Sequence, residues 1–125
     1  MDELMGRRMP SSIEAEQSVI GSMIIDSRCV PDVIEILKPE DFYIEQNREI
    51  FETIHSMFSY SLPIDPVTVL DRMKVRGVYD ERTSRDYIMQ LMDITPTAAN
   101  VKYYAKIVRD KAILRQIAAA AEDIS

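Results

Sequence analysis

The sequence predicts an all-α protein: a small multi-helix head, followed by a long helix that forms the first arm of a helical hairpin. Apolar residues recur at spacings of three and four through most of the chain, as they do along one face of a helix. Helix-start signals such as Asp65-Pro66 precede several of these stretches. No segment predicts a strand. We expect a flexible arm over residues 1–10, the head over residues 11–97 and the long helix over residues 98–125.

The stretch Ser11–Asp26 predicts the central helix of the head. Ser11 and Glu14 have the spacing of a capping box. The apolar residues behind them form one face, with the polar residues largely between; the apolar set is Ile13, Val19, Ile20, Met23 and Ile24, and the polar set is Glu14, Glu16, Gln17 and Ser22. Gly21 within a helix costs about 1 kcal/mol relative to Ala, which indicates that another helix crosses closely there.

The next segments predict a short helix, a turn and a longer helix. Val30–Leu37 is a short helix that has Pro31 in its first turn. Pro39–Tyr43 is a tight turn that places Phe42 in the core. Gln46–Tyr60 is the third main helix, and its apolar stripe contains Ile50, Phe51, Ile54, Met57 and Phe58.

Two more helices complete the predicted head. The first starts at the N-cap Asp65 and ends at Gly77, where a left-handed residue is favoured. The second runs from Thr83 or Ser84 through Met92, and its apolar side contains Tyr87, Ile88, Leu91 and Met92. Thr95-Pro96 ends it.

The longest predicted helix runs from about Ala98 to Ile124, a length of roughly 40 Å. Its first half serves the head through Val101, Tyr104, Ala105 and Val108. Its second half presents Ile107, Leu114, Ile117, Ala118, Ala121 and Ile124 on a partly different face. Because nothing that follows in the chain can cover this second face, we expect a partner, either the next helix of a hairpin or another subunit. Of the adjacent pair Tyr103 and Tyr104, we expect the second ring to pack on the head and the first to be free. The helical pattern still runs at the end of the sequence, so we also expect a longer parent protein.

The composition argues against several classes of function. The chain has 125 residues and a formal net charge of −6, whereas domains that grip phosphate backbones are usually basic. One Cys excludes an intrachain disulfide and fits a reducing cytoplasm. We find neither a signal peptide nor an apolar run of the roughly 20 residues that a membrane helix needs, so we expect a cytoplasmic protein that binds other proteins.

No residue pattern predicts catalysis, a cofactor or a metal. The three glycines, Gly6, Gly21 and Gly77, cannot build a phosphate-binding loop, so ATP hydrolysis within these residues is not expected. The acidic residues Asp65, Asp71, Asp80 and Glu81 do not have the spacing of a calcium loop. His55 is the only His; it is interpreted as a solvated or hydrogen-bonded side chain, and a histidine phosphotransfer bundle is the alternative.

The basic residues are interpreted as solvated helix faces, partly paired with Asp71, Asp110 and Glu122. They are Arg72, Lys74 and Arg76 on one helix, and Lys102, Lys106, Arg109, Lys111 and Arg115 on the last. A helix-turn-helix DNA-binding module with Asp65–Arg76 as its second helix stays open as an alternative.

Several segments together resemble a known family. They are PSSIEAEQSVIGSMI at Pro10–Ile24, PEDFY at Pro39–Tyr43, REIF at Arg48–Phe51, IDPVTV at Ile64–Val69 and TPTAANVKYYAKIVRDKAILR at Thr95–Arg115. In order and spacing the chain resembles the N-terminal domain of the bacterial replicative DNA helicase, the DnaB family. Residues 77–86 depart from it, because relatives often carry a Gly-Gly turn there.

The resemblance implies a helical head and hairpin, a hexameric ring whose N-terminal domains form a trimer of dimers, and recruitment of the C-terminal domain of primase. A helicase loader is a further possible partner. ATP and Mg²⁺ would belong to a downstream RecA-like motor domain, and DNA would be bound only through the full-length protein. The implied primase contacts are Glu14, Tyr87, Ala118 and Ile124, and the expected self-association residues are Tyr103, Ile107, Leu114, Ile117 and Ala121. Purely structural roles stay open for Glu14 as a cap, Tyr87 in the core and Ile124 within the hairpin.

Overall fold

Six α-helices and two short 3-10 turns make up the part of the chain that the computed structural model describes, which is residue 9 and residues 11–124, with side chains to residue 123. The helices are α1 (Ile13–Ile25), α2 (Val30–Ile36), α3 (Glu45–Ser59), α4 (Pro66–Arg76), α5 (Ser84–Asp93) and α6 (Val101–Ile124), and the turns are η1 (Ser27–Cys29) and η2 (Pro39–Asp41). The described residues contain no strand, and the all-α prediction is confirmed. The arm predicted over residues 1–10 lies outside the described residues, except for Met9.

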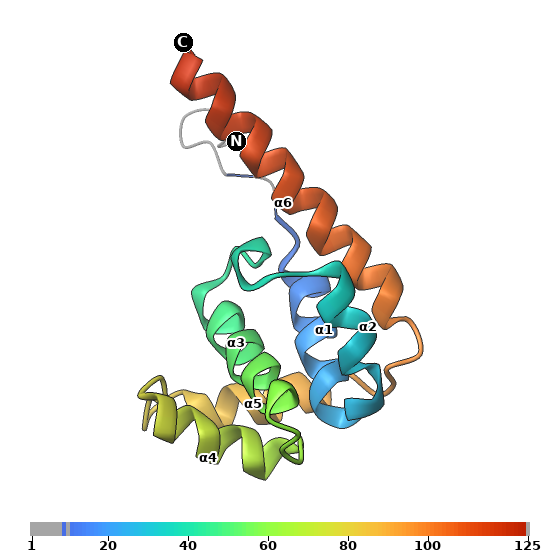
Figure 1. The fold of residues 1–125 in the computed structure, drawn as a ribbon, viewed down its shortest axis with the longest axis vertical. Coiled ribbons are helices and arrows are strands. Elements are labelled where there is room, and N and C mark those ends of the chain that lie inside the picture. The colour runs from blue at the N-terminus through green and yellow to red at the C-terminus, as the bar shows by residue number, and fades with distance from the viewer. Residues whose placement is uncertain (1–8, 10, 125) are drawn as a thin grey trace.

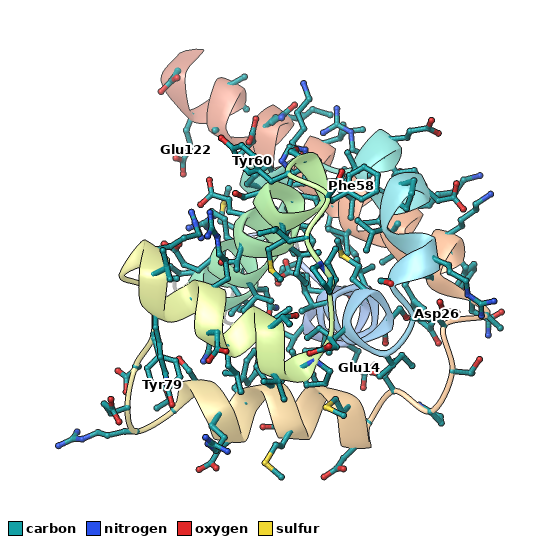
Figure 2. The ribbon with its side chains drawn as sticks, turned by 60° about the horizontal axis from the view of Figure 1, so that its bottom comes forward. Glu14, Asp26, Phe58, Tyr60, Tyr79 and Glu122 are labelled. Carbon is teal, nitrogen blue, oxygen red and sulfur yellow. The ribbon has the colours of Figure 1, made fainter. Side chains whose placement is uncertain are left out.

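The helix α1 lies at the centre of the head and contacts every other helix. In Figure 1, α1, α2 and α3 stand upright, α4 and α5 cross below them, and α6 runs up one side and projects beyond the head. The helices α4 and α5 contact each other and lie side by side in Figure 2. The prediction that the first helix organises the fold is therefore confirmed.

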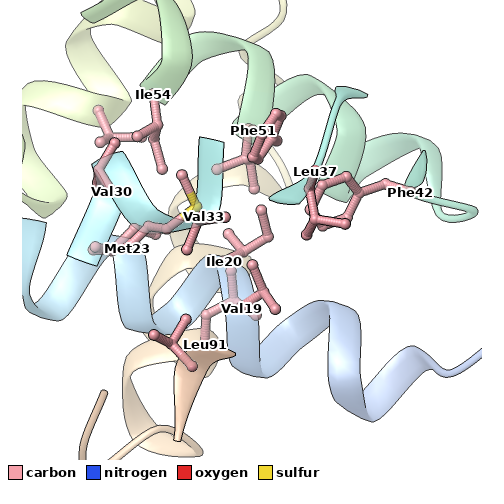
Figure 3. Packing of buried hydrophobic residues seen from close by; sticks show 14 of the residues in the cluster. Val19, Ile20, Met23, Val30, Val33, Leu37, Phe42, Phe51, Ile54 and Leu91 are labelled. Carbon is pink, nitrogen blue, oxygen red and sulfur yellow. The ribbon is translucent and has the colours of Figure 1, made fainter. Parts of the chain in front are cut away.

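The hydrophobic core surrounds one face of α1. Val19, Ile20 and Met23 are completely buried. The other side chains that Figure 3 shows around them come from α2, α3, α5 and the residue after η2, and include Val33, Phe42, Phe51, Ile54 and Leu91. The rings of Phe42 and Phe51 lie 4.9 Å apart between centroids. Phe42 thus occupies the core position that the sequence predicted.

The start of α1 differs from the prediction. Ser12, not Ser11, is the N-cap, and its hydroxyl accepts a hydrogen bond from the Ala15 amide at 3.2 Å. Ile13, expected on the apolar face, is 52% exposed. Glu16, expected among the polar positions, is 1% exposed. Ile13 is exposed because the first residue of α1 extends past the core, whereas Glu16 is buried because the head covers a wider arc of this helix than its apolar residues mark.

Glu16 is buried because it caps a different helix. Ile44, the N-cap residue of α3, has no side-chain acceptor of its own. The Glu16 carboxylate accepts hydrogen bonds from the Tyr43 amide at 2.6 Å, the Ile44 amide at 3.2 Å and Asn47 Nδ2 at 3.0 Å. A carboxylate at this position satisfies orphan N–H groups and complements the positive end of the helix dipole.

Gly21 marks a close helix crossing, as predicted. A Cβ atom at this position would lie 2.2 Å from Thr95 Oγ1 and 3.0 Å from the Leu91 carbonyl oxygen. The segment that approaches is the end of α5 and the residues just after it. Only Gly permits this approach, since any side chain would overlap Thr95.

The predicted start and end of α4 are confirmed, whereas the predicted burial of Phe58 in α3 is wrong. Asp65 caps α4 through the Thr68 amide at 2.9 Å, and Gly77 has a left-handed φ of 76°. Phe58, predicted on the buried stripe of α3, is 41% exposed, because the C-terminal turn of α3 extends past the core. In the segment 77–86, the Asp80 amide donates to the buried Ser84 hydroxyl at 2.8 Å, which leads the chain into α5.

Candidate functional site

The helix α6 has two halves that differ in burial. Val101, Ala105, Val108 and Ala112 are at most 5% exposed and pack on the head, on one face at spacings of three and four. Beyond Ala112 none of the described side chains is buried. This second half is the part of α6 that projects beyond the head in Figure 1.

The projecting half carries an uncovered apolar stripe. Leu114 is 46% and Ile117 is 59% exposed, and Ala118 and Ala121 continue the stripe at helical spacing. Ile113 adds further apolar surface at 37% exposure. Exposed apolar surface of this kind is typical of protein–protein contacts.

The other two expected self-association residues lie on the half of α6 that packs on the head. Tyr103 is 66% exposed, and its ring meets the Tyr104 ring edge-on at 5.5 Å between centroids. Tyr104 packs against the core, as expected. Ile107 differs from the other expected contact residues, because its side chain is half-buried against the core of its own chain.

Two arginines hold α6 against the η2 turn. Arg109 Nη1 lies 2.9 Å from Asp41 Oδ1, and Arg115 Nη2 donates to the Asp41 carbonyl oxygen at 2.7 Å. The Arg115 guanidinium also lies over the Tyr43 ring at 5.1 Å from its centroid. The Asp41 carboxylate is buried and additionally accepts the Lys38 amide at 2.9 Å. These contacts determine the direction in which the arm leaves the head.

The interpretation of the basic residues as solvated faces is therefore wrong for several of them. Arg109 binds the buried carboxylate of Asp41. Arg76 Nη1 donates to Thr53 Oγ1 at 2.7 Å, and its Nη2 lies 3.5 Å from Glu52 Oε1. These partners are distant in sequence, so helical spacing could not reveal them.

The expected primase contacts on the head share one region. Glu14 is exposed at the start of α1 and lines a groove of ≈ 380 Å³ with Gln17, Ser18, Ile94 and Tyr104. Gln17 Nε2 donates to the Tyr87 hydroxyl at 3.5 Å, and that hydroxyl in turn donates to Asn47 Oδ1. Burial raises the pKa of the Tyr87 phenol. Gln17 therefore lines the groove beside Glu14 and also contacts Tyr87.

The two remaining candidates lie on the arm. Ala118 is partly exposed on the projecting half of α6, and the side chain of Ile124 is outside the described residues. Sequence reasoning missed the residues that position the two candidate regions. They are Glu16 and Asn47 in the head, and Asp41, Arg109 and Arg115 where the arm leaves it. The PEDFY motif was the only local signal that pointed to any of them.

The alternative functions receive little support from their geometry. His55 is exposed, and its ring stacks on Phe51 at 6.2 Å between centroids. In α4, Arg76 is bound within the head and Lys74 Nζ lies 4.8 Å from the Tyr79 ring centroid, so two of three bases are not free for phosphates. Among the described residues, no group of three or more His, Cys, Asp and Glu side chains could hold a metal ion, and no helix there is long and apolar enough to cross a membrane.

Comparisons with curated proteins point to one family. The family model of the DnaB-like helicase N-terminal domain matches residues 8–110. The chain is 39% identical over 126 residues to the replicative DNA helicase DnaB of Geobacillus stearothermophilus, covering 100% of this chain and 28% of that protein. It is 36% identical to the DnaB of Leifsonia xyli, covering 95% of this chain and 26% of the relative.

Solved structures show the same fold. The N-terminal domain of DnaB helicase from Mycobacterium tuberculosis superposes with a TM-score of 0.89 at 35% identity, over 94% of this chain and 85% of that one. The N-terminal domain of DnaB from Helicobacter pylori, described with its interactions with primase, has a TM-score of 0.75 at 21% identity, over 88% and 85% of the two chains. The chain spans about a quarter of the length of its curated relatives, and the matching domain accounts for most of its residues. The chain therefore belongs to the family of DnaB-like helicase N-terminal domains.

Proposed function

We propose that this chain is the collar domain of a replicative DNA helicase, which holds the subunits of the ring together and recruits primase. The observation that carries the proposal is the uncovered apolar stripe on the projecting half of α6, with Leu114 and Ile117 at its centre. The clamp at Asp41 fixes the angle of this arm, so a contact between arms would also fix the spacing of the heads.

Primase recruitment is proposed for the region around Glu14 and Tyr87. Its support is the groove beside Glu14, the hydrogen bonds that join Gln17 and Tyr87, and the description of the H. pylori relative with its interactions with primase. Tethering raises the local concentration of primase at the fork, and this requires no chemistry from the domain. In this proposal, ATP hydrolysis with Mg²⁺, DNA binding and loader contacts belong to the full-length protein, which acts in the bacterial cytoplasm.

Sedimentation of the chain tests the assembly proposal. Leu114→Asp and Ile117→Asp each place a charge in the apolar stripe, so both should lower the mass of the assembly. Gln116→Asp adds the same charge at an exposed position between them and should leave the mass unchanged. A mass that is the same for all variants would refute the arm as the contact.

Calorimetric titration with a primase C-terminal domain tests the second role. Glu14→Gln removes one exposed carboxylate at the groove and should weaken binding. Glu45→Gln removes another exposed carboxylate, at the start of α3, and should have no effect. Equal affinities for both variants and the unmodified chain would refute the assignment of Glu14.

A further inference from the structure

The groove beside Glu14 continues along α1 into a second groove. The second groove has a volume of ≈ 150 Å³ and extends to Ser22 of α1 and to Asn100, the residue before α6. It shares three residues with the first groove, namely Ser18, Ile94 and Tyr104. Together the two grooves form one channel, with α1 on one side and the α5–α6 connection and the start of α6 on the other. This connection passes beside α1 in Figure 1, and α1 contacts both helices.

The length of the channel follows from the spacing of its residues on α1. Glu14, Ser18 and Ser22 are four residues apart, so they lie on one side of the helix. From Glu14 to Ser22 the helix rises roughly 12 Å, at 1.5 Å per residue. An extended chain covers roughly 3.3–3.6 Å per residue. A bound segment of about four residues would therefore span the channel from end to end.

Close packing holds the wall of the channel in place. Thr95 lies against α1 at Gly21, where a Cβ atom would be 2.2 Å from Thr95 Oγ1. Ser22 and Thr95 are at most 5% exposed, and the Thr97 hydroxyl accepts a hydrogen bond from the Ala99 amide at 3.1 Å. The connection is thus bound to α1 before any ligand arrives, which lowers the conformational entropy lost on binding.

The two ends of the channel differ in charge. Glu14 is exposed at one end, and no other charged residue is found among the described residues that line the channel. The far end carries the hydroxyl and amide groups of Ser22, Thr97 and Asn100 beside the apolar Val101. A cation is favoured near Glu14. A charge at the far end would lose water without meeting an opposite charge, so an uncharged side chain is favoured there.

We propose that a segment of primase lies along the whole channel, with a Lys or Arg side chain at Glu14 and an uncharged side chain at the far end, about four residues away. This inference rests on the primase recruitment proposed above, and it adds the chemistry and direction of the bound segment. Between the two ends, Ile94, which is 48% exposed, contacts the segment. Asn100 forms a hydrogen bond with the uncharged side chain and is thus a specificity-determining residue.

Calorimetric titration of the chain with a primase C-terminal domain tests the far end. Asn100→Asp keeps the size of the side chain, and both residues are favoured directly before a helix. The variant should bind about tenfold more weakly, because its carboxylate cannot donate a hydrogen bond and meets no cation there. Gln90→Glu makes the same chemical change at an exposed residue of α5 that lines neither groove, and it should have no effect.

The salt dependence of the same titration tests the cation at Glu14. Raising the salt concentration should weaken binding by the unmodified chain more than binding by Glu14→Gln, because salt screens the ion pair that the variant lacks. An equal loss for both chains would contradict the position of the Lys or Arg side chain.

Photo-crosslinking identifies the bound segment. With p-benzoylphenylalanine in place of Thr97, which is exposed at the far end, the crosslinked primase peptide should contain Lys or Arg about four residues from the attachment site. The same photoreactive residue in place of Gln90 should not give this product.

The outcomes separate this inference from the proposed function. If the unmodified chain does not bind the primase domain, primase recruitment is refuted and the inference with it. If Glu14→Gln weakens binding and Asn100→Asp does not, recruitment stands and the continuation to the far end is wrong. Tighter binding by Asn100→Asp, or a crosslinked peptide without a basic residue near the attachment site, would also overturn the inference. A crosslink between two copies of the chain in the absence of primase would make the channel a contact between copies and would contradict it.

Discussion

Replacing Gly21 with Ala should destabilise the protein, although Ala is the better helix former. The new Cβ would lie 2.2 Å from Thr95 Oγ1, 2.9 Å from Thr95 Cβ and 3.0 Å from the Leu91 carbonyl oxygen. Overpacking of a buried site costs about 1–3 kcal/mol, and an overlap with two rigid neighbours belongs at the upper end of that range. Ala regains about 1 kcal/mol of helix propensity, which leaves a net loss of about 2 kcal/mol.

Urea and thermal unfolding at one fixed protein concentration measure this loss. For a chain of this length, a loss of about 2 kcal/mol should lower the midpoint temperature by roughly 8 °C. Thr95→Ala removes the nearest clashing atom, so the double variant should recover about 1 kcal/mol relative to the sum of the single changes. If Gly21→Ala were as stable as the unmodified chain, or strictly additive with Thr95→Ala, the steric argument would be refuted.

Three further predictions concern polar groups that the head wholly or partly encloses. Asp41→Asn should lower the free energy of unfolding by about 1.5–3 kcal/mol, because it weakens the ion pair with Arg109. Amide hydrogen exchange in residues 101–115 should accelerate. Unchanged exchange would contradict the role of Asp41 in holding α6 against the head. Glu16→Gln should lower the free energy of urea unfolding by about 2 kcal/mol, because the side-chain NH₂ of Gln would face donors, namely the Tyr43 and Ile44 amides or Asn47 Nδ2. Unchanged stability would contradict the capping of α3 by Glu16. Burial raises the pKa of Cys29 to about 11, so alkylation by iodoacetamide at pH 8 should be about 100-fold slower than in the unfolded chain; equal rates would show that the thiol is not buried.

The sign of the stability effect of Cys29 follows from the same shift. The folded chain favours the neutral thiol, and its contribution to stability is fully present below the unfolded pKa of about 8.5. That contribution is lost as the pH rises towards the folded pKa of about 11. Stability should therefore fall over this alkaline range, and Cys29→Ser should reduce the fall.

Sequence reasoning succeeded where the physical cause is local. Asp65, Pro66 and Gly77 act within one turn of their own helix, so their capping and left-handed roles were readable. The burial of Phe42 and the close approach at Gly21 also followed from single residues with few alternatives. The apolar stripe on the second half of α6 was predicted because its residues recur at helical spacing.

Errors arose where burial depends on neighbours that helical periodicity does not reveal. Ile13 and Phe58 have apolar side chains on helix ends that extend past the core, and both are exposed. Glu16 has the opposite error, since a carboxylate is expected at the surface unless a partner binds it. Its partners are 27, 28 and 31 residues away in the sequence.

By itself, the sequence determined the all-α class, the order of the helices and the apolar arm, because these depend on residue spacing within single helices and on local capping. Only the tertiary structure decided how the arm leaves the head and which residues shape the candidate surfaces. Asp41 meets Arg109 and Arg115 across 68 and 74 residues, and Tyr87 meets Asn47 across 40. Contacts at such separations depend on the packing of the whole core, so a pattern read along the chain does not contain them.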